Sequence, residues 1–187
     1  MRYLLLLLLT PNLVIADVGV DLLVTTGGFG FESGAGIQFD GDGRYGDFGW
    51  DLQASWTDEL KTGGDSGHRQ LAQAAARYYM DPIFLEAGVD HGRYSTKFAD
   101  GRAWKKSGTS PLLGVGAYFE NIEITLRYAG HDNTIDRLHG LYLGIEIPWQ
   151  SFTFGLMARI AEFEQSGTTQ NDSAIMLEFG WRVKGNK

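Results

Sequence analysis

The feature that most constrains this chain is a two-residue alternation between apolar and polar side chains, clearest near the C-terminal end. One face of this last segment would carry Ile175, Leu177, Phe179, Trp181 and Val183. The other face would carry Met176, Glu178, Gly180 and Arg182. A period of two predicts a β-strand with one apolar and one polar face. Because the same pattern recurs along most of the chain, it predicts an all-β fold.

The composition narrows the class of protein. The chain has 187 residues, which fits a single domain. Its net charge is −7 and it has no basic run, so we expect no nucleic-acid partner. It contains no cysteine, which excludes a disulfide framework and thiolate metal sites, and we expect no cofactor.

Residues 1–16 differ from the rest of the chain. Arg2 precedes an apolar run over residues 3–9, and Val14, Ile15 and Ala16 follow. This order predicts a secretory signal peptide of the Sec type, removed before Asp17, with an uncleaved anchor as the alternative. No later stretch approaches the roughly 20 apolar residues of a membrane helix. We therefore expect one domain over residues 17–187.

Ten strands are expected from the alternation. Their predicted ranges are 18–26, 29–39, 47–57, 68–79, 83–93, 112–119, 122–130, 138–149, 152–163 and 174–183. Two assignments have alternatives. Residues 70–80 are rich in Ala and could form a helix on propensity. Gly27-Gly28 could be a hairpin tip, and without the first strand and one other the count falls to eight.

The connections alternate between tight turns and long polar loops. Three tight turns are expected at Asp81-Pro82, Glu120-Asn121 and Gln150-Ser151, although Pro82 is awkward in a two-residue turn and that connection could be longer. The long loops are expected at residues 58–67, 94–111, 131–137 and 164–173. Outer-membrane barrels combine short periplasmic turns with longer external loops.

The tight turns also predict how neighbouring strands pair. Centring on Asp81-Pro82 places Arg77 opposite Glu86 and Tyr78 opposite Leu85. The other two turns give the pairs Phe119–Ile122, Ala117–Ile124 and Val115–Leu126, and Trp149–Phe152, Ile147–Phe154 and Ile145–Leu156. Each register keeps apolar residues opposite apolar residues, and a slip of one residue would reverse every face.

Strand length and aromatic position indicate that the apolar face meets lipid. Ten residues in a strand tilted by about 40° rise about 25 Å, the height of the apolar band of a membrane barrel. Trp149, Phe152, Phe119 and Trp181 lie near strand ends, as in an interfacial aromatic girdle. We therefore predict a closed antiparallel up-and-down transmembrane β-barrel of about ten strands. The alternative is a soluble periplasmic β-barrel that binds an apolar ligand inside.

The polar face would then line a narrow lumen filled with charge. Eight residues are expected to form ion pairs there: Arg77, Glu86, Glu123, Arg127, Glu146, Arg159, Glu178 and Arg182. A wide channel requires about 16 strands, so a general porin is not expected.

In these respects the chain resembles small Gram-negative outer-membrane β-barrel proteins. The resemblance is architectural, covers nearly all of residues 17–183, and implies insertion into the outer membrane by the barrel-insertion machinery. It also implies contact with outer-membrane lipid and lipopolysaccharide, and we expect a monomer. Many such barrels end in an aromatic residue, whereas here Val183 and the tail over residues 184–187 follow Phe179 and Trp181.

The leading functional hypothesis is a structural or surface-interaction role without enzymatic activity. The external residues expected to touch a partner are Phe98, Trp104, Lys105 and Lys106. The alternative is a lipid-modifying or proteolytic enzyme that uses rim histidines, chosen from His68, His91, His131 and His139. Because adjacent residues of a strand face opposite sides, a catalytic His–Asp pair would have to join strands, and Asp90 with His131 is the candidate.

Overall fold

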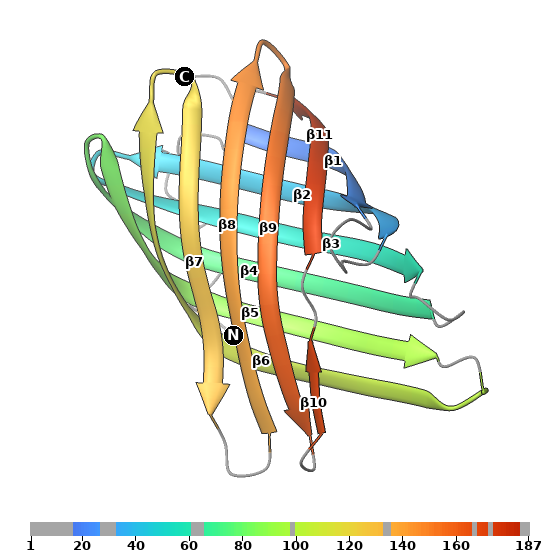
Figure 1. The fold of residues 1–187 in the computed structure, drawn as a ribbon. Helices are drawn as coiled ribbons and strands as arrows, with labels where there is room; N and C mark the ends of the chain where they lie inside the picture. Colours follow the sequence, from blue (N-terminus) through green and yellow to red (C-terminus); the bar gives the residue numbers. More distant parts are fainter. Residues whose placement is uncertain are drawn as a thin grey trace, which may run out of the picture.

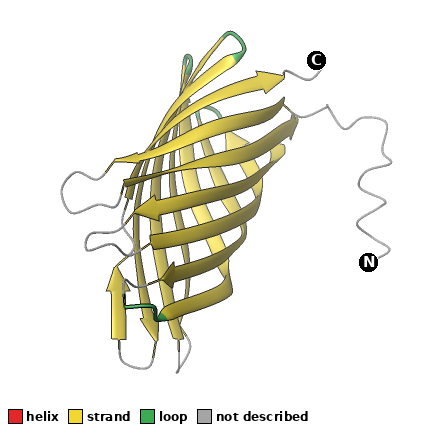
Figure 2. Ribbon diagram, turned by 90° about the vertical axis from the view of Figure 1, so that its right-hand side faces the viewer, coloured by secondary structure: helices red, strands yellow, loops and turns green. Residues whose placement is uncertain are grey.

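The computed structural model describes residues 17–26, 33–60, 66–97, 100–132, 136–165, 168–171 and 174–183. The predicted signal peptide and the Gly27-Gly28 tip lie outside these ranges. The described residues form eleven strands: β1 (Asp17–Thr26), β2 (Ser33–Tyr45), β3 (Phe48–Leu60), β4 (Ser66–Met80), β5 (Ile83–Lys97), β6 (Ala103–Phe119), β7 (Ile122–Asp132), β8 (Asp136–Trp149), β9 (Phe152–Gln165), β10 (Thr168–Asn171) and β11 (Ala174–Val183). Figure 2 accordingly shows strands and loops only.

These strands close into one antiparallel up-and-down barrel (Figure 1). Each strand pairs with the next in sequence from β1 to β9, and β11 pairs with both β9 and β1. β10 and β11 both pair with β9 in a continuous register, so they are two parts of one strand. The barrel therefore has ten strands, as predicted, and the eight-strand alternative is wrong.

The three predicted hairpin registers are confirmed. Arg77 lies opposite Glu86, Phe119 opposite Ile122, and Trp149 opposite Phe152. The connection at Asp81-Pro82 contains two residues and not more, and its peptide bond is cis, as in type VI turns. The Ala-rich segment is also a strand, because its outward alanines pair with the neighbouring strands.

A fourth tight turn, at Gly46-Asp47, was not predicted. β2 was expected to end at Phe39, but it continues to Tyr45 and pairs with β3 as far as Phe48. The hydrophobic alternation fades over this stretch because Gly41 and Gly43 occupy outward positions. Gly46 adopts a left-handed φ of 60°, which glycine accepts without steric cost, and this fits the tight turn.

Several strands extend into the segments that were predicted to be long loops. Residues 94–111 were expected to form a loop, but β5 runs to Lys97 and β6 begins at Ala103. β3, β4, β7, β8 and β9 are likewise longer than expected at this end. Backbone pairing continues above the apolar belt, where most residues are polar and the alternation no longer marks a strand.

The polarity of the barrel is inverted relative to a soluble protein. Its outer face carries exposed apolar side chains on every side, including Val20, Leu22, Leu52, Leu85, Val89, Leu113, Leu126, Leu143, Leu156 and Leu177. Charged side chains such as Asp21, Arg77, Glu86 and Asp90 are buried inside, with at most 3% exposure. The described residues contain no helix long and apolar enough to span a membrane.

Aromatic side chains surround the short-turn end of the barrel. Those exposed on its outer face include Tyr45, Phe48, Tyr78, Phe119, Trp149, Phe152 and Trp181. Phe48 packs on Tyr78 with ring centroids 5.2 Å apart, and Phe152 stacks on Phe179 at 5.8 Å. Such a ring is typical of a membrane–water interface, so the outer face is suited to lipid.

This surface leads to a first prediction about solubility. Because the apolar belt cannot be left in water, the folded protein should be recovered only in detergent or lipid. On gels it should migrate differently with and without boiling, since a closed barrel resists cold SDS. Recovery of a folded monomer from a detergent-free extract would contradict the membrane assignment.

Candidate functional site

Glycines make room for the large side chains inside the narrow barrel. Glu86 lies over Gly114 of the neighbouring strand, and a Cβ added to that glycine would come within 2.6 Å of Glu86 Oε2. Glu178 lies in the same way over Gly155, and the Phe84 ring covers Gly116. These three lumen side chains therefore lie over a glycine of the neighbouring strand, where no other side chain competes for space.

Near the short-turn end, Glu86 joins two arginines. Arg77 Nε donates to Glu86 Oε1 at 2.7 Å, and Arg127 Nε donates to Glu86 Oε2 at 2.7 Å. Arg77 and Glu86 face each other in the β4–β5 register, whereas Arg127 comes from β7. One buried carboxylate thus binds two guanidinium groups from different strands.

Both arginines also reach across the lumen to other acids. Arg127 Nη2 lies 3.1 Å from Asp51 Oδ1, which joins β7 to β3 on the far side of the network. Arg77 Nη2 lies 3.0 Å from Asp51 Oδ2 and 3.1 Å from Glu123 Oε1. These five residues form a charge network that closes this level of the barrel.

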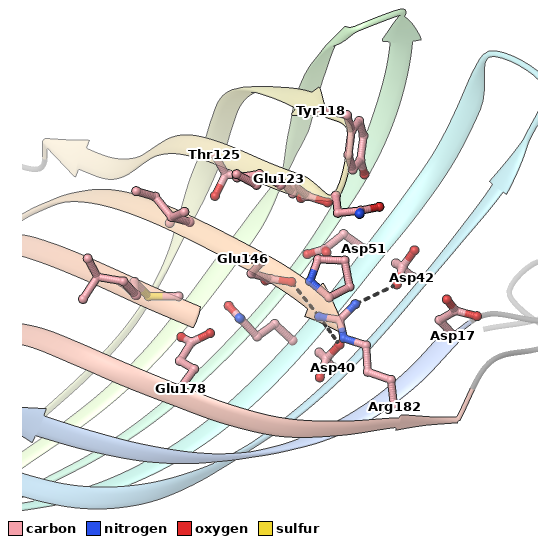
Figure 3. A pocket seen from close by; sticks show the side chains of 18 of the residues that line it. Asp17, Asp40, Asp42, Asp51, Tyr118, Glu123, Thr125, Glu146, Glu178 and Arg182 are labelled. Carbon is pink, nitrogen blue, oxygen red and sulfur yellow. Dashed lines mark hydrogen bonds and ion pairs between the residues drawn. The ribbon is translucent and has the colours of Figure 1, made fainter. Parts of the chain in front are cut away.

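A second cluster is centred on Arg182 (Figure 3). Its Nη2 lies 2.7 Å from Glu146 Oε2 and 3.2 Å from Asp40 Oδ2, and its Nη1 lies 3.6 Å from Asp42 Oδ1. Glu146 is on β8 and Asp40 is on β2, so Arg182 of β11 bridges strands that are not neighbours. The structure therefore pairs Glu146 with Arg182. Both residues were predicted to lie in the lumen, but the sequence did not indicate that they are partners.

The lumen is not filled by charge throughout. Farther from the short turns, an apolar layer crosses it, formed by Leu71, Ala75, Leu112, Ala129 and Tyr142, with Met157 packed against them. These side chains lie two positions from buried polar residues or glycines of the same strand, such as Arg69, Gln73, Arg127 and Gly140, so their inward position was recognisable from parity alone. The sequence reasoning named charged residues for contacts inside the lumen and did not predict this apolar layer.

Between the short turns and these layers lies a cavity of about 250 Å³. Its lining is acidic, with Asp17, Asp40, Asp42, Asp51, Glu120, Glu123, Glu146 and Glu178 against Arg77, Arg127 and Arg182. Figure 3 shows Glu178, Glu146 and Arg182 pointing into it. Among the described residues, no group of histidines and acids is arranged to hold a metal ion.

The remaining predicted residues are not brought into one site. Asp90 is fully buried and accepts a hydrogen bond from Gln73 Nε2 at 2.9 Å. The side chain of His131 lies outside the described part of the chain, so the Asp90–His131 pair stays a prediction. Arg159 and Glu178 are buried in the lumen. Lys105 is exposed, whereas Phe98 and the side chains of Trp104 and Lys106 also lie outside the described part.

A histidine–aspartate pair that was not predicted lies on the outer face beyond the belt. His68 Nδ1 is 2.5 Å from Asp58 Oδ1, and the two residues face each other in the β3–β4 register. The sequence reasoning placed Asp58 in a loop, so its strand neighbours were not considered. The alternation Leu52, Ala54, Trp56, Asp58 would have placed this residue on the outer face.

The charge network leads to a prediction about Glu86. Replacing Glu86 by Ala leaves two buried arginines without their shared carboxylate, and breaking a buried ion pair costs about 3–5 kcal/mol. Adding Arg77→Ala should recover part of this loss, since one of the stranded charges is removed. Urea unfolding in micelles, followed by tryptophan fluorescence, measures both. Equal stability of the single and double variants would contradict the network.

The glycine positions lead to a second prediction. In Gly116→Ala the new methyl group would collide with the buried Phe84 ring, and such overpacking costs about 1–3 kcal/mol. Gly41→Ala is the matched control, because the nearest atom to its Cβ is 3.6 Å away. The same unfolding measurement should show a loss for Gly116→Ala only. A similar loss in both variants would mean that the ring does not occupy this position.

Comparison with known proteins shows likeness in fold alone. No family model and no curated protein matches the chain. Neisserial surface protein A is 18% identical with a TM-score of 0.43, over 90% of this chain and 95% of that one. The attachment invasion locus protein Ail of Yersinia pestis is 13% identical with a TM-score of 0.40, over 90% and 97%. An anion-selective porin from Comamonas acidovorans is 15% identical with a TM-score of 0.43, over 87% of this chain and 59% of the porin.

Proposed function

We propose that this chain is an outer-membrane barrel that stays closed to solutes and acts through its surface, in a structural or interaction role. The observation that carries the proposal is the inverted polarity of the barrel, with an apolar belt outside and charges paired inside. A β-barrel of this polarity belongs in a bilayer, and closed barrels of this kind are typical of Gram-negative outer membranes. Sec export and delivery by the barrel-insertion machinery follow from that location.

The layered interior argues against a channel. The charge network of Arg77, Glu86 and Arg127 crosses one level, and the apolar layer around Leu112 and Tyr142 crosses the next. An ion would have to break buried ion pairs and then pass apolar side chains without hydration. We therefore infer that the residues in the lumen stabilise the barrel and do not form a transport path.

The outer rim offers cations to anionic lipid. Arg93, Lys97 and Lys105 all occupy outward positions on β5 and β6 above the apolar belt, and all three are exposed. Exposed Lys and Arg beside a membrane surface attract phosphate groups. Lipopolysaccharide carries such phosphates in the outer leaflet, so we propose it as the surface partner.

Arg102, in the turn between these strands, is differently placed. Its Nε donates to Asp100 Oδ2 at 2.7 Å, and its backbone N–H donates to Asp100 Oδ1 at 3.0 Å. These hydrogen bonds hold the pKa of the Asp100 carboxyl below its usual range. Because the Arg102 charge already has a carboxylate partner, this arginine is a natural control for the three outward cations.

The lipopolysaccharide contact is tested with a triple variant, Arg93→Gln, Lys97→Gln and Lys105→Gln, in nanodiscs. Removing three charges at about 1 kcal/mol each predicts a loss of affinity of roughly 100-fold at low salt, and a weaker salt dependence. Arg102→Gln should bind nearly as the parent does. Unchanged affinity in the triple variant would contradict the proposed contact.

The closed lumen is tested by conductance. The parent protein in a planar bilayer should show no stable channel steps, since both layers must open for an ion to pass. A variant combining Arg127→Ala, Glu86→Ala and Leu112→Gly should admit small ions if it remains folded. Steady conductance by the parent protein would overturn the closed-lumen proposal.

A further inference from the structure

Four residues with complementary chemistry form a row across the outer face of the barrel. Asp58 of β3 lies opposite His68 of β4, His68 lies opposite Ser95 of β5, and Ser95 lies opposite Lys105 of β6. All four have the parity of the lipid-facing residues on their strands, because Thr57, Arg69 and Asp90 mark the buried face. We call Asp58, His68, Ser95 and Lys105 the rim row.

Two contacts set the tautomer of the histidine in the rim row. His68 Nδ1 lies 2.5 Å from Asp58 Oδ1, which accepts the proton on that nitrogen. The Gln70 amide nitrogen Nε2 lies 3.2 Å from His68 Nε2 and can only donate, so His68 Nε2 is the acceptor. This tautomer leaves Nε2 unprotonated, as a general base requires, and the serine hydroxyl would take the place of the Gln70 N–H group at this nitrogen.

The serine and lysine continue the row on the other side of the histidine. Directly opposed residues of antiparallel strands have Cβ atoms about 4.5–5.5 Å apart, so Ser95 is close enough to approach the imidazole by side-chain rotation. Lys105 is the next residue in the row and carries a positive charge. All four residues line one hollow of about 790 Å³, together with Ser66 and Lys97.

The height of the row relative to the apolar belt indicates its substrate. Trp56 is the last apolar residue of β3 whose exposure on the outer face the structure describes, and it precedes Asp58 by two positions. Two residues of a tilted strand rise about 5 Å, which places Asp58 in the polar interface layer that flanks the hydrocarbon core. Ser95 is six positions beyond Val89 and Lys105 is eight positions from Leu113, so the row rises outward from Asp58 through the polar layer. The ester bonds of membrane lipids lie in this layer.

From these observations we propose that the rim row hydrolyses acyl esters of anionic lipids in the outer leaflet. Ser95 and His68 would be the catalytic residues, and Asp58 a positioning residue that orients the imidazole. Lys105 would stabilise the oxyanion of the tetrahedral intermediate, and Lys97 and Arg93 would hold the phosphate of the lipid. This activity goes beyond the proposed surface role and does not depend on the state of the lumen.

The reaction balances without a cofactor. Ser95 Oγ attacks the ester carbonyl while His68 Nε2 takes the hydroxyl proton, and collapse of the intermediate expels the lipid alcohol, which receives that proton. Water then attacks the acyl-serine, with His68 again accepting and returning a proton. The products are a free fatty acid and a lipid that has lost one acyl chain.

The first experiment uses a long-chain alkyl fluorophosphonate on the detergent-folded protein. The expected result is one adduct on Ser95, located by mass spectrometry, and its loss in Ser95→Ala. Ser107→Ala is the matched control, because Ser107 is also exposed on the outer face but lies opposite Arg93 and not a histidine. A heat-dependent gel shift verifies that each variant is folded.

The second experiment measures hydrolysis of a 4-nitrophenyl decanoate in mixed micelles. His68→Gln should lower the rate by about 10²–10⁴-fold, the usual contribution of a general base. Asp58→Asn should also lower it, whereas Asp58→Glu should restore part of the rate, since a carboxylate can again accept from Nδ1. His91→Gln, outward on β5 but bound to Thr109, should leave it unchanged.

The lipid source is separated by vesicle composition. Fatty acid release is measured from phosphatidylglycerol vesicles and from vesicles that carry lipid A, each with the parent protein and with Ser95→Ala. Release that depends on Ser95 identifies which lipid is the substrate. An unlabelled Ser95 in the folded parent, labelling that survives in Ser95→Ala, or no Ser95-dependent release from either lipid would overturn the proposal.

Discussion

The absence of water in the hydrocarbon core determines the rest of this structure. Every backbone N–H and C=O group in that layer must be paired within the protein, and a closed sheet satisfies all of them. The outer face must then be apolar, and the alternating polar residues are forced into a narrow lumen. Those residues can remain there only with partners, which is why Glu86 binds both Arg77 and Arg127. The ion pairs follow from the membrane rather than adding an independent source of stability.

The lumen also explains the distribution of glycine. A ten-stranded barrel leaves little room inside, so several large inward side chains lie over a glycine of the neighbouring strand. Gly114 provides it for Glu86, and Gly116 provides it for Phe84. Parity places these glycines on the same face as the charges, and the pairing register places them directly opposite. Charge and glycine are thus two parts of one packing solution.

The sequence predicted what depends on neighbours along the chain and missed what depends on the closure of the barrel. The Arg77–Glu86 register follows from one tight turn, because hydrophobic pairing on the outer face excludes a slip by one residue. The contact between Arg127 and Asp51 joins β7 to β3, and nothing local to either residue indicates it. The turn at Gly46 was missed because the glycines before it removed the apolar alternation, not because the pairing stops.

The alternation of inward and outward side chains continues above the apolar belt, but outward positions there need not be apolar. Inside the bilayer an outward position demands an apolar side chain, but above the belt it permits any polar one. Antiparallel register then sets residues of neighbouring strands side by side, although they are far apart in sequence. Four strands extend beyond the apolar belt with an unbroken register, and this register aligns the residues of the rim row, Asp58, His68, Ser95 and Lys105. A rigid sheet holds such a row more accurately than loops could, so strand extension is itself a way to place chemistry at the lipid interface.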